Sequence, residues 1–345
     1  MTPVSTREAD VDVATGVNLL QPPADGGAEL SAARIARVGE ITVRRLLPLR
    51  RRRSVGPWCF IDHYGPVAVD GTAGMDVPPH PHIGLQTVTW LISGEVLHRD
   101  SLGSEQLIRP GQLNLMTAGR GLAHAEESLR GREADPRNLP ARSPDLHGVQ
   151  LWTALPDASR QVAPAFEHHA ELPVFGSGGL RVTVFLGALG PVSSPATVFW
   201  PGVGAEIAAG SGAAELGSPG PARPEAAGEL PLPSGHEHVM FVSAGSAQVA
   251  GTVLRTGELL YLPPGRDRVA VSAPAGSRLF LLGGQPLGED LLMWWNFVAR
   301  TPEEIAAATA RWADGGYGTV PGYRGAPLAA PALDAARLRR PGSSR

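Results

Sequence analysis

The sequence predicts an all-β fold of the sandwich or barrel type, followed by one helix near the C-terminus. Short apolar runs recur along the chain and are separated by Gly and Pro, of which there are 43 and 33. Many short strands joined by turns are typical of sandwiches and barrels. With 345 residues, the chain is long enough for two domains or one large one.

The expected strands follow one another from residue 41 and are interrupted by a long loop at 208–235, which is poor in large apolar side chains. They are 41–47, 86–92, 112–116, 149–155, 180–186, 239–242, 259–262, 269–271 and 279–282. The helix is predicted to begin after Thr301, because Pro302 suits the first helical position and Glu304 completes a capping box. Gly315 is expected to end it.

Composition excludes several classes of function. The chain has no lysine, so neither a Schiff-base lysine nor a phosphate-binding Walker lysine is present. Cys59 is the single cysteine, which excludes an intrachain disulfide and a thiolate metal cluster. The formal net charge of −3 argues against a nucleic-acid partner, and the arginine run 50–53 is interpreted as a solvated strand end or loop. No apolar stretch suits a signal peptide or a membrane span, so we expect a soluble, cytoplasmic monomer.

Two short motifs carry residues that bind metals. His80 and His82 are spaced i, i+2, which on a strand points both imidazoles to one face. His124 and Glu126 have the same spacing. A lone His-x-His is more often a surface pair, but the second motif favours a metal site made by all four residues. Three imidazoles and a carboxylate suit Fe(II), Mn(II), Cu(II), Ni(II) or Zn.

Three segments together resemble the pirin family of the cupin superfamily. They are HPHIGLQTVTW at 80–90, LMTAGRGLAHAE at 115–126 and MWWNFVARTPEE at 293–304. The resemblance covers roughly residues 44–316. It implies a bicupin, with two double-stranded β-helix (jelly-roll) barrels packed together and a C-terminal helix. The expected organisation is a flexible arm (1–30), a metal-binding cupin domain (31–165), a degenerate cupin domain (166–320) and a flexible tail (321–345).

The resemblance also implies one divalent metal ion, with Fe(II) as the first choice, held by His80, His82, His124 and Glu126. One departure concerns Gln86, because pirins with flavonol oxygenase activity usually carry an acidic residue there. Glutamine cannot accept a proton at neutral pH. Glu126 is then the one obvious catalytic base near the metal, with Gln86 and Arg120 as residues that would orient a substrate.

The C-terminal half repeats part of the cupin pattern without its full ligand set. His236 and His238 resemble the first motif, but Arg268 stands near the place of the later histidine. Two imidazoles make a weak metal site, so this barrel is expected to be a structural one without metal.

Two functions from different classes follow from the resemblance. The first is a metal-dependent dioxygenase of the quercetin 2,3-dioxygenase type, acting on a flavonol-like or other small aromatic enol. The alternative is a non-catalytic iron protein that binds a protein partner in a redox-dependent way. An isomerase or a metal-free storage relative is a third. An enzyme needs an apolar cavity above the metal, whereas a sensor can have a closed one.

Overall fold

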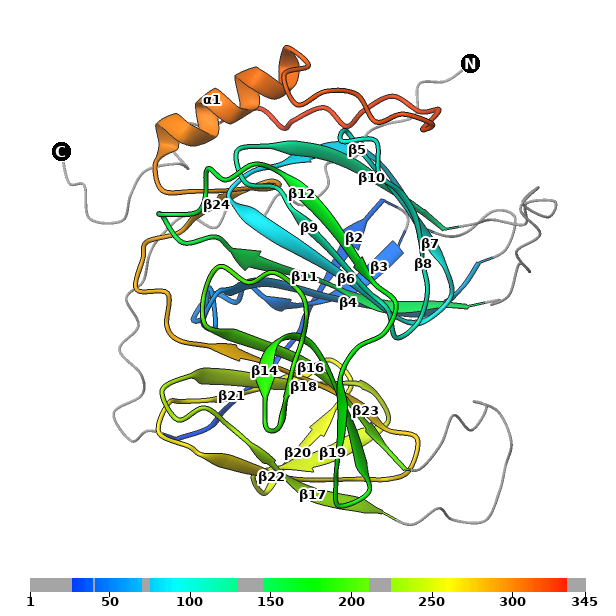
Figure 1. Ribbon diagram of the computed structural model, residues 1–345, viewed down its shortest axis with the longest axis vertical. Helices are drawn as coiled ribbons and strands as arrows, with labels where there is room; N and C mark the ends of the chain where they lie inside the picture. Colours follow the sequence, from blue (N-terminus) through cyan, green and yellow to red (C-terminus); the bar gives the residue numbers. More distant parts are fainter. Residues whose placement is uncertain (1–26, 40, 70–74, 129–144, 211–224, 334–345) are drawn as a thin grey trace.

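A computed structural model of the chain describes residues 27–39, 41–69, 75–128, 145–210 and 225–333. Most of the arm expected at 1–30 and the last part of the tail expected at 321–345 lie outside these residues. The described part consists almost entirely of strands, which form two barrels stacked on one another, and one C-terminal helix (Figure 1). The all-β prediction is confirmed.

The N-terminal barrel is built from a seven-stranded and a four-stranded antiparallel sheet. The larger sheet has the order β12 (Ala165–His169), β9 (Leu113–Thr117), β6 (Leu85–Ser93), β11 (Asp145–Ala154), β4 (Trp58–Ala68), β3 (Ile41–Leu47) and β2 (Arg34–Val38). The smaller has the order β5 (Asp76–His82), β10 (Leu122–Ser128), β7 (Val96–Asp100) and β8 (Glu105–Ile108).

The C-terminal barrel repeats this plan. Its larger sheet has the order β1 (Glu29–Ala32), β21 (Glu258–Leu262), β18 (Glu237–Ala244), β23 (Arg278–Gly284), β16 (Gly202–Ala209), β14 (Leu180–Leu189) and β13 (Val174–Ser177), with β15 (Val192–Ser193) beside β14. Its smaller sheet has the order β17 (Ala226–Pro231), β22 (Arg268–Ala273), β19 (Ser246–Val249) and β20 (Thr252–Arg255).

Two strands pair across the expected division of the chain. β1 adds to the C-terminal sheet beside β21, although the chain then returns to build the N-terminal barrel. β12 adds to the N-terminal sheet beside β9, just beyond residue 165. The domain boundary at residue 165 stays a prediction. β1 precedes the N-terminal barrel in the chain but pairs with the C-terminal one, and β12 begins at this boundary and pairs with the N-terminal barrel.

The two barrels share an apolar interface formed by one face of each large sheet. Trp90 packs against Phe185 with ring centroids 5.0 Å apart, and Phe241 stacks on Phe280 at 5.0 Å. Trp58 is fully buried, and its indole N–H donates to the backbone oxygens of Val203 and Gly283 in the other barrel. Because this indole is both packed and hydrogen-bonded across the interface, it fixes the relative position of the barrels.

The chain returns to the N-terminal barrel after β23. A hairpin of β24 (Leu292–Trp294) and β25 (Phe297–Ala299) leads to α1 (Pro302–Ala313), which lies over the N-terminal barrel (Figure 1). The predicted Thr301 cap is confirmed, since its side chain accepts a hydrogen bond from the Glu304 backbone N–H. The expected capping box differs in its second bond, because the Glu304 side chain accepts from the backbone N–H of Arg300. α1 is the one α-helix within the described residues, and it is not long and apolar enough to cross a bilayer.

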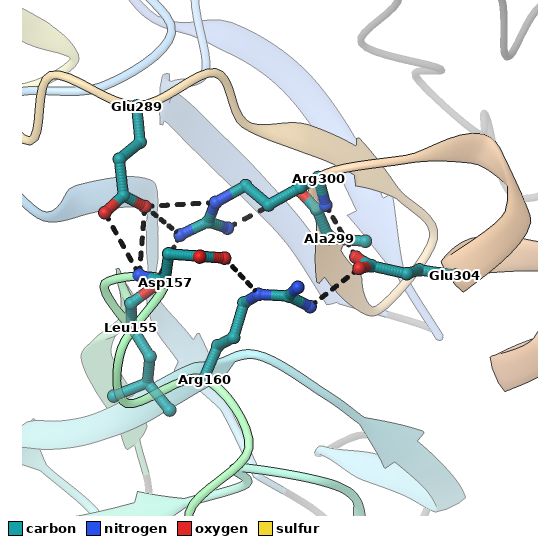
Figure 2. A network of polar contacts seen from close by, with 7 residues as sticks. All are labelled: Leu155, Asp157, Arg160, Glu289, Ala299, Arg300 and Glu304. Carbon is teal, nitrogen blue, oxygen red and sulfur yellow. Dashed lines mark hydrogen bonds and ion pairs between the residues drawn. The ribbon is translucent and has the colours of Figure 1, made fainter.

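A closed ring of polar contacts fastens this returning segment to the first barrel (Figure 2). Arg300 binds Glu289, and its backbone N–H donates to Glu304. Glu304 pairs with Arg160 at 2.8 Å, Arg160 bonds Asp157 at 2.6 Å, and the Asp157 backbone N–H donates to Glu289. The ring joins the loop after β11, the loop before β24 and the start of α1, so it holds the hairpin against the N-terminal barrel.

Two expectations about irregular segments need correction. The loop expected at 208–235 contains β17, which pairs with β22 through its whole length. Part of the expected flexible tail is packed against the barrel, because the Leu328 N–H donates to the Pro79 carbonyl and Trp312 donates to the Leu328 carbonyl. Short edge strands and backbone-mediated contacts such as these leave little signal in side-chain patterns.

The two barrel interiors differ in chemistry. The C-terminal barrel is filled by aliphatic side chains such as Met240, Leu262 and Leu281. The N-terminal barrel instead buries polar and ionisable groups, including His80, His82, His98, His124, Glu126, Asp62 and Thr89. Buried polar groups are unfavourable unless they are paired or bind a ligand. The candidate site therefore lies in the N-terminal barrel.

A buried pair of histidines joins β4 and β11 beside the second barrel. His63 Nε2 lies 2.8 Å from His147 Nε2, and both rings are enclosed. Burial lowers the pKa of His63 to about 3 and that of His147 to about 4, and the nearby Arg44 and Arg278 act in the same direction. The pair is neutral in the folded protein at neutral pH.

This pair makes the fold sensitive to acid. In the unfolded chain each histidine takes up a proton near pH 6.5, whereas in the folded chain it stays neutral down to its lowered pKa of about 3 or about 4. Stability is therefore lost as the pH falls from 6.5 towards these lowered pKa values. Each histidine should contribute a loss of about 2 kcal/mol in the free energy of unfolding between pH 6.5 and pH 5. Denaturant unfolding of His63→Gln should show a flatter pH dependence than unfolding of the wild type, with His169→Gln, on the half-buried edge strand β12, as the control.

Candidate metal centre

Two paired strands bring three histidines together. In the β5–β10 ladder His124 lies directly opposite His80, and Leu122 lies opposite His82. The ring centroids of the three imidazoles are 4.4 to 5.0 Å apart, and each side chain is at most 6% exposed. The i, i+2 spacing read from the sequence therefore has the expected effect, because both rings of the first motif face the barrel interior.

Backbone carbonyls fix two of these rings. Nδ1 of His80 donates to the Pro78 carbonyl at 2.9 Å, and Nδ1 of His82 donates to the Asn296 carbonyl at 3.0 Å. Each ring then carries its proton on Nδ1 and leaves the Nε2 lone pair free, which is the usual arrangement of metal-binding histidines. Asn296 belongs to the β24–β25 turn, so the returning segment contributes directly to the site.

The three imidazoles are uncharged at neutral pH. Burial lowers the pKa of His80 to about 4 and the pKa of His82 and His124 well below the ordinary value. The Nε2 atoms of His82 and His124 are 3.1 Å apart. Two lone pairs facing each other at this distance repel unless a cation or proton lies nearby. Ligands on adjacent corners of an octahedron, with metal–nitrogen bonds of about 2.1 Å, are about 3.0 Å apart, so the donor set fits a transition metal.

Glu126 lies at the edge of this cluster. Its carboxylate forms a second group of converging ligand atoms with His98 and His124, which overlaps the three-histidine group at His124. The register of β10 against β5 shifts between His124 and Glu126, while on its other side Glu126 pairs with His98. Thr89 donates a 2.7 Å hydrogen bond to the carboxylate, and burial raises the pKa of Glu126. This carboxyl group is therefore more basic than an exposed one.

A hydrogen-bonded chain supports His124 from behind. Its Nδ1 lies 3.4 Å from Nδ1 of His98, whose Nε2 lies 3.3 Å from a carboxylate oxygen of Asp100. Asp100 also accepts the backbone N–H groups of Leu102 and Ser104. His98, which sequence reasoning did not select, can therefore accept a hydrogen bond from Nδ1–H of His124 and donate one to Asp100. This orders the tautomers so that Nε2 of His124 faces the other two imidazoles.

A cavity of about 250 Å³ adjoins the three histidines and Glu126. This volume is close to the lower limit of about 300 Å³ for small-molecule sites. Its wall is largely apolar and includes Phe60, Trp152 and Trp295. Phe60 and Trp152 stack with centroids 4.0 Å apart, and Trp152 meets the ring of His82 edge-on at 5.1 Å. The cavity can enclose a flat aromatic molecule.

Two residues that we expected beside the metal lie elsewhere. Gln86 is buried and fully engaged, donating to Thr117 and to the Thr197 carbonyl and accepting from Thr153. It is not part of the cavity wall, and neither is the exposed Arg120. Gln86 therefore does not face the cavity in this chain. The wall residues Arg45, Asp62, Gln150 and Asn296 gave no local signal in the sequence.

The second histidine pair has a different setting. His238 is fully buried at the end of the aliphatic core of the C-terminal barrel, and His236 lies beside it with ring centroids 5.9 Å apart. Within the described residues, neither belongs to a group of three or more converging ligand atoms. The expectation of a structural second barrel without metal stays a prediction that this geometry supports.

Two stacked barrels, one with converging histidines and one with an aliphatic core, define a cupin protein of the two-domain type with a candidate metal site in the first domain. Comparison with known families agrees: the pirin model matches residues 40–153, and the model of the pirin C-terminal cupin domain matches residues 222–318. The chain belongs to the pirin family.

Similar proteins cover most of the chain. A protein of Pseudomonas aeruginosa named "Putative quercetin 2,3-dioxygenase" is 43% identical over 87% of this chain and 89% of its own length. A pirin-like protein of Caulobacter vibrioides is 37% identical over 82% of this chain and 92% of its own. The crystal structure of a quercetin 2,3-dioxygenase from Acinetobacter baumannii superposes with a TM-score of 0.80 and 38% identity, covering 90% of this chain and 97% of the other.

The chain behind His124 leads to a prediction about metal affinity. His98→Leu removes the acceptor for the His124 Nδ1 proton, so the ring loses its orientation while the three histidines remain. Affinity for a divalent metal should fall about 10- to 100-fold, as is usual when the partner of a metal-binding histidine is lost. Competition with a coloured chelator measures this fall. His168→Leu, on surface strand β12, is the matched control, and an unchanged affinity in His98→Leu would contradict the assignment.

Proposed function

We propose that this protein is a metal-dependent dioxygenase that acts on flavonol-like or other small aromatic enols. His80, His82 and His124 hold a divalent metal, with Fe(II) as the first choice, and Glu126 completes the set. When bound, such a metal supplies a Lewis acid and a path for electrons between an enolate and O₂. The presence of a cavity beside three neutral, oriented imidazoles carries the proposal.

The chain's own residues prepare the substrate. The aromatic wall around Trp152 holds a flat ring system beside the histidines. Glu126 lies next to the ligands and is made more basic by burial, so it can take the proton of an enol hydroxyl. The hydrogen bond from Thr89 orients the carboxylate for this transfer.

A carboxylate that takes a proton in this way need not stay bound to the metal. Glu126 is grouped with His98 and His124 rather than with the three-histidine group. This position supports a dual role, in which Glu126 completes the ligand set at rest and serves as the base when substrate enters. The names of the relatives, which refer to quercetin 2,3-dioxygenase, support the same class of substrate.

The alternative of a non-catalytic iron protein that binds a partner makes a different demand on the structure. A redox sensor needs the metal and a surface that responds to it, but it needs no cavity for a small molecule. The cavity of about 250 Å³ with its aromatic wall favours the enzyme.

One prediction of the proposed function concerns the metal ligands. Each histidine supplies a lone pair that alanine lacks, so His80→Ala with His82→Ala should lower bound metal to background. The protein should stay folded, because the strands' apolar residues form the core. His236→Ala with His238→Ala is the matched control in the second barrel and should keep its metal. Elemental analysis of the purified proteins decides between the sites, and loss of metal only from the control pair would refute the assignment.

Another prediction of the proposed function concerns activity. The iron-loaded protein should consume O₂ in a one-to-one ratio with a flavonol or a related enol, and Glu126→Gln should lower kcat at least about 100-fold because it removes the base. An oxygen electrode with a panel of enols measures both. If no enol supports stoichiometric O₂ consumption by the metal-loaded wild type, the dioxygenase proposal fails and the binding role is favoured.

A further inference from the structure

A row of polar side chains crosses the inner face of the N-terminal barrel. In the ladders of five neighbouring strands, Arg45 on β3 lies opposite Asp62 on β4, Asp62 opposite Gln150 on β11, and Gln150 opposite Thr89 on β6. Asn114 on β9 continues the row beyond Thr89. Arg45, Asp62 and Gln150 line the cavity together with the histidines and Glu126. We call Arg45, Asp62, Gln150 and Thr89 the polar row.

The polar row contains two hydrogen-bonded groups, the pair Arg45–Asp62 at one end and Gln150 with Thr89, which also binds Glu126, at the other. Arg45 binds Asp62 through two parallel bonds of 2.8 Å. Thr89 donates to Glu126, and its hydroxyl oxygen also lies 3.0 Å from the Gln150 side chain. The atom of Gln150 that faces Thr89 is the carbonyl oxygen Oε1, and because a hydroxyl has one proton, Thr89 donates to either Glu126 or Gln150 at a time. The NH₂ group of Gln150 is then directed away from Thr89.

Thr89 binds Glu126, but Asp62 and Gln150 line the cavity without being candidate metal ligands, and packing does not require polar side chains at their positions. The neighbouring positions along β4 and β11 are aromatic, with Phe60 opposite Trp152. A buried ion pair in such surroundings is unfavourable compared with apolar side chains of similar size. Asp62 is only 2% exposed, and desolvation raises its pKa despite the bound arginine. Groups of this kind in a cavity wall are typical of ligand recognition.

The aromatic wall runs in the same direction as the polar row. The Arg45 guanidinium lies 4.6 Å over the ring of Phe60, which stacks on Trp152, which in turn meets His82. A flat molecule lying along this wall would therefore reach from the metal-binding imidazoles to the Arg45–Asp62 pair. Three strand spacings of about 4.8 Å separate Arg45 from Thr89, or about 14 Å between their backbones.

We propose that the polar row selects planar enols of two or three rings that carry a hydroxyl group on the ring remote from the metal. The Asp62 carboxylate accepts a hydrogen bond from this hydroxyl, and N–H groups of Arg45 and Gln150 face the hydroxyl oxygen as donors. Arg45 and Asp62 neutralise each other, so the row suits an uncharged hydroxyl better than a carboxylate. This inference rests on the proposed function, because it concerns the substrate of the same cavity.

A pair of matched ligands tests the inference by binding alone. 3-Hydroxyflavone and 3,4′-dihydroxyflavone differ by one hydroxyl on the remote ring. Titration calorimetry on the full chain loaded with Zn(II), without oxygen, separates binding from turnover. The wild type should bind the dihydroxy compound about 10- to 100-fold more tightly, as expected for one hydrogen bond to a charged group.

Two carboxylates paired with arginine offer a matched control. Asp62→Asn removes the charged acceptor and keeps one of the two bonds to Arg45, so the preference should fall below about threefold. Glu206 pairs with Arg278 at 2.7 Å outside the cavity, and Glu206→Gln should keep the full preference. Gln150→Leu is a second variant within the polar row and should also weaken the preference.

The outcomes separate this inference from the proposed function. If both compounds bind the wild type equally well, or if Glu206→Gln loses the preference as much as Asp62→Asn, the role of the polar row is overturned while the dioxygenase proposal stands. If neither compound binds the metal-loaded wild type, the proposed substrate class is wrong and the inference fails with it. The comparison of the two compounds on the wild type does not depend on whether any variant folds.

Discussion

Three neutral imidazoles with converging lone pairs, enclosed in a barrel, are the constraint on which the rest of this structure depends. The Nε2 atoms of His82 and His124 are 3.1 Å apart, a distance that two metal ligands adopt and that two free lone pairs avoid. Everything around them keeps the rings in place. The β5–β10 pairing sets His124 opposite His80, and backbone carbonyls hold the Nδ1 protons of His80 and His82.

The second barrel serves this site without taking part in its chemistry. Its interior is filled by aliphatic side chains, and Trp58 joins it to the first barrel by packing and by two hydrogen bonds. From this support the chain returns over the first barrel and delivers Asn296 to His82. The ring of contacts around Arg300 and Glu304 fastens the returning segment (Figure 2). The apolar C-terminal barrel thus supports the N-terminal barrel, whose interior is polar, through the interface at Trp58.

The sequence predicts those features that local patterns encode. The i, i+2 spacing of His80 and His82 indicates a shared face, and the Thr301 cap marks the start of the helix; both agree with the structure. Features that arise from strand register over long separations leave no such pattern. Arg45 meets Asp62 only because β3 and β4 pair in one register, and His98 faces His124 only because β7 lies beside β10. Gln86 shows the converse, since its closeness to His82 in sequence does not place it in the cavity.

We expect the three histidines of the N-terminal barrel to hold a single metal ion. The anomalous difference map of crystals of the metal-loaded protein, measured at the absorption edge of the metal, locates that ion. One strong peak is expected within bonding distance of the Nε2 atoms of His80, His82 and His124. A peak beside His236 and His238 instead, or no peak in the first barrel of protein that elemental analysis shows to contain metal, would contradict it.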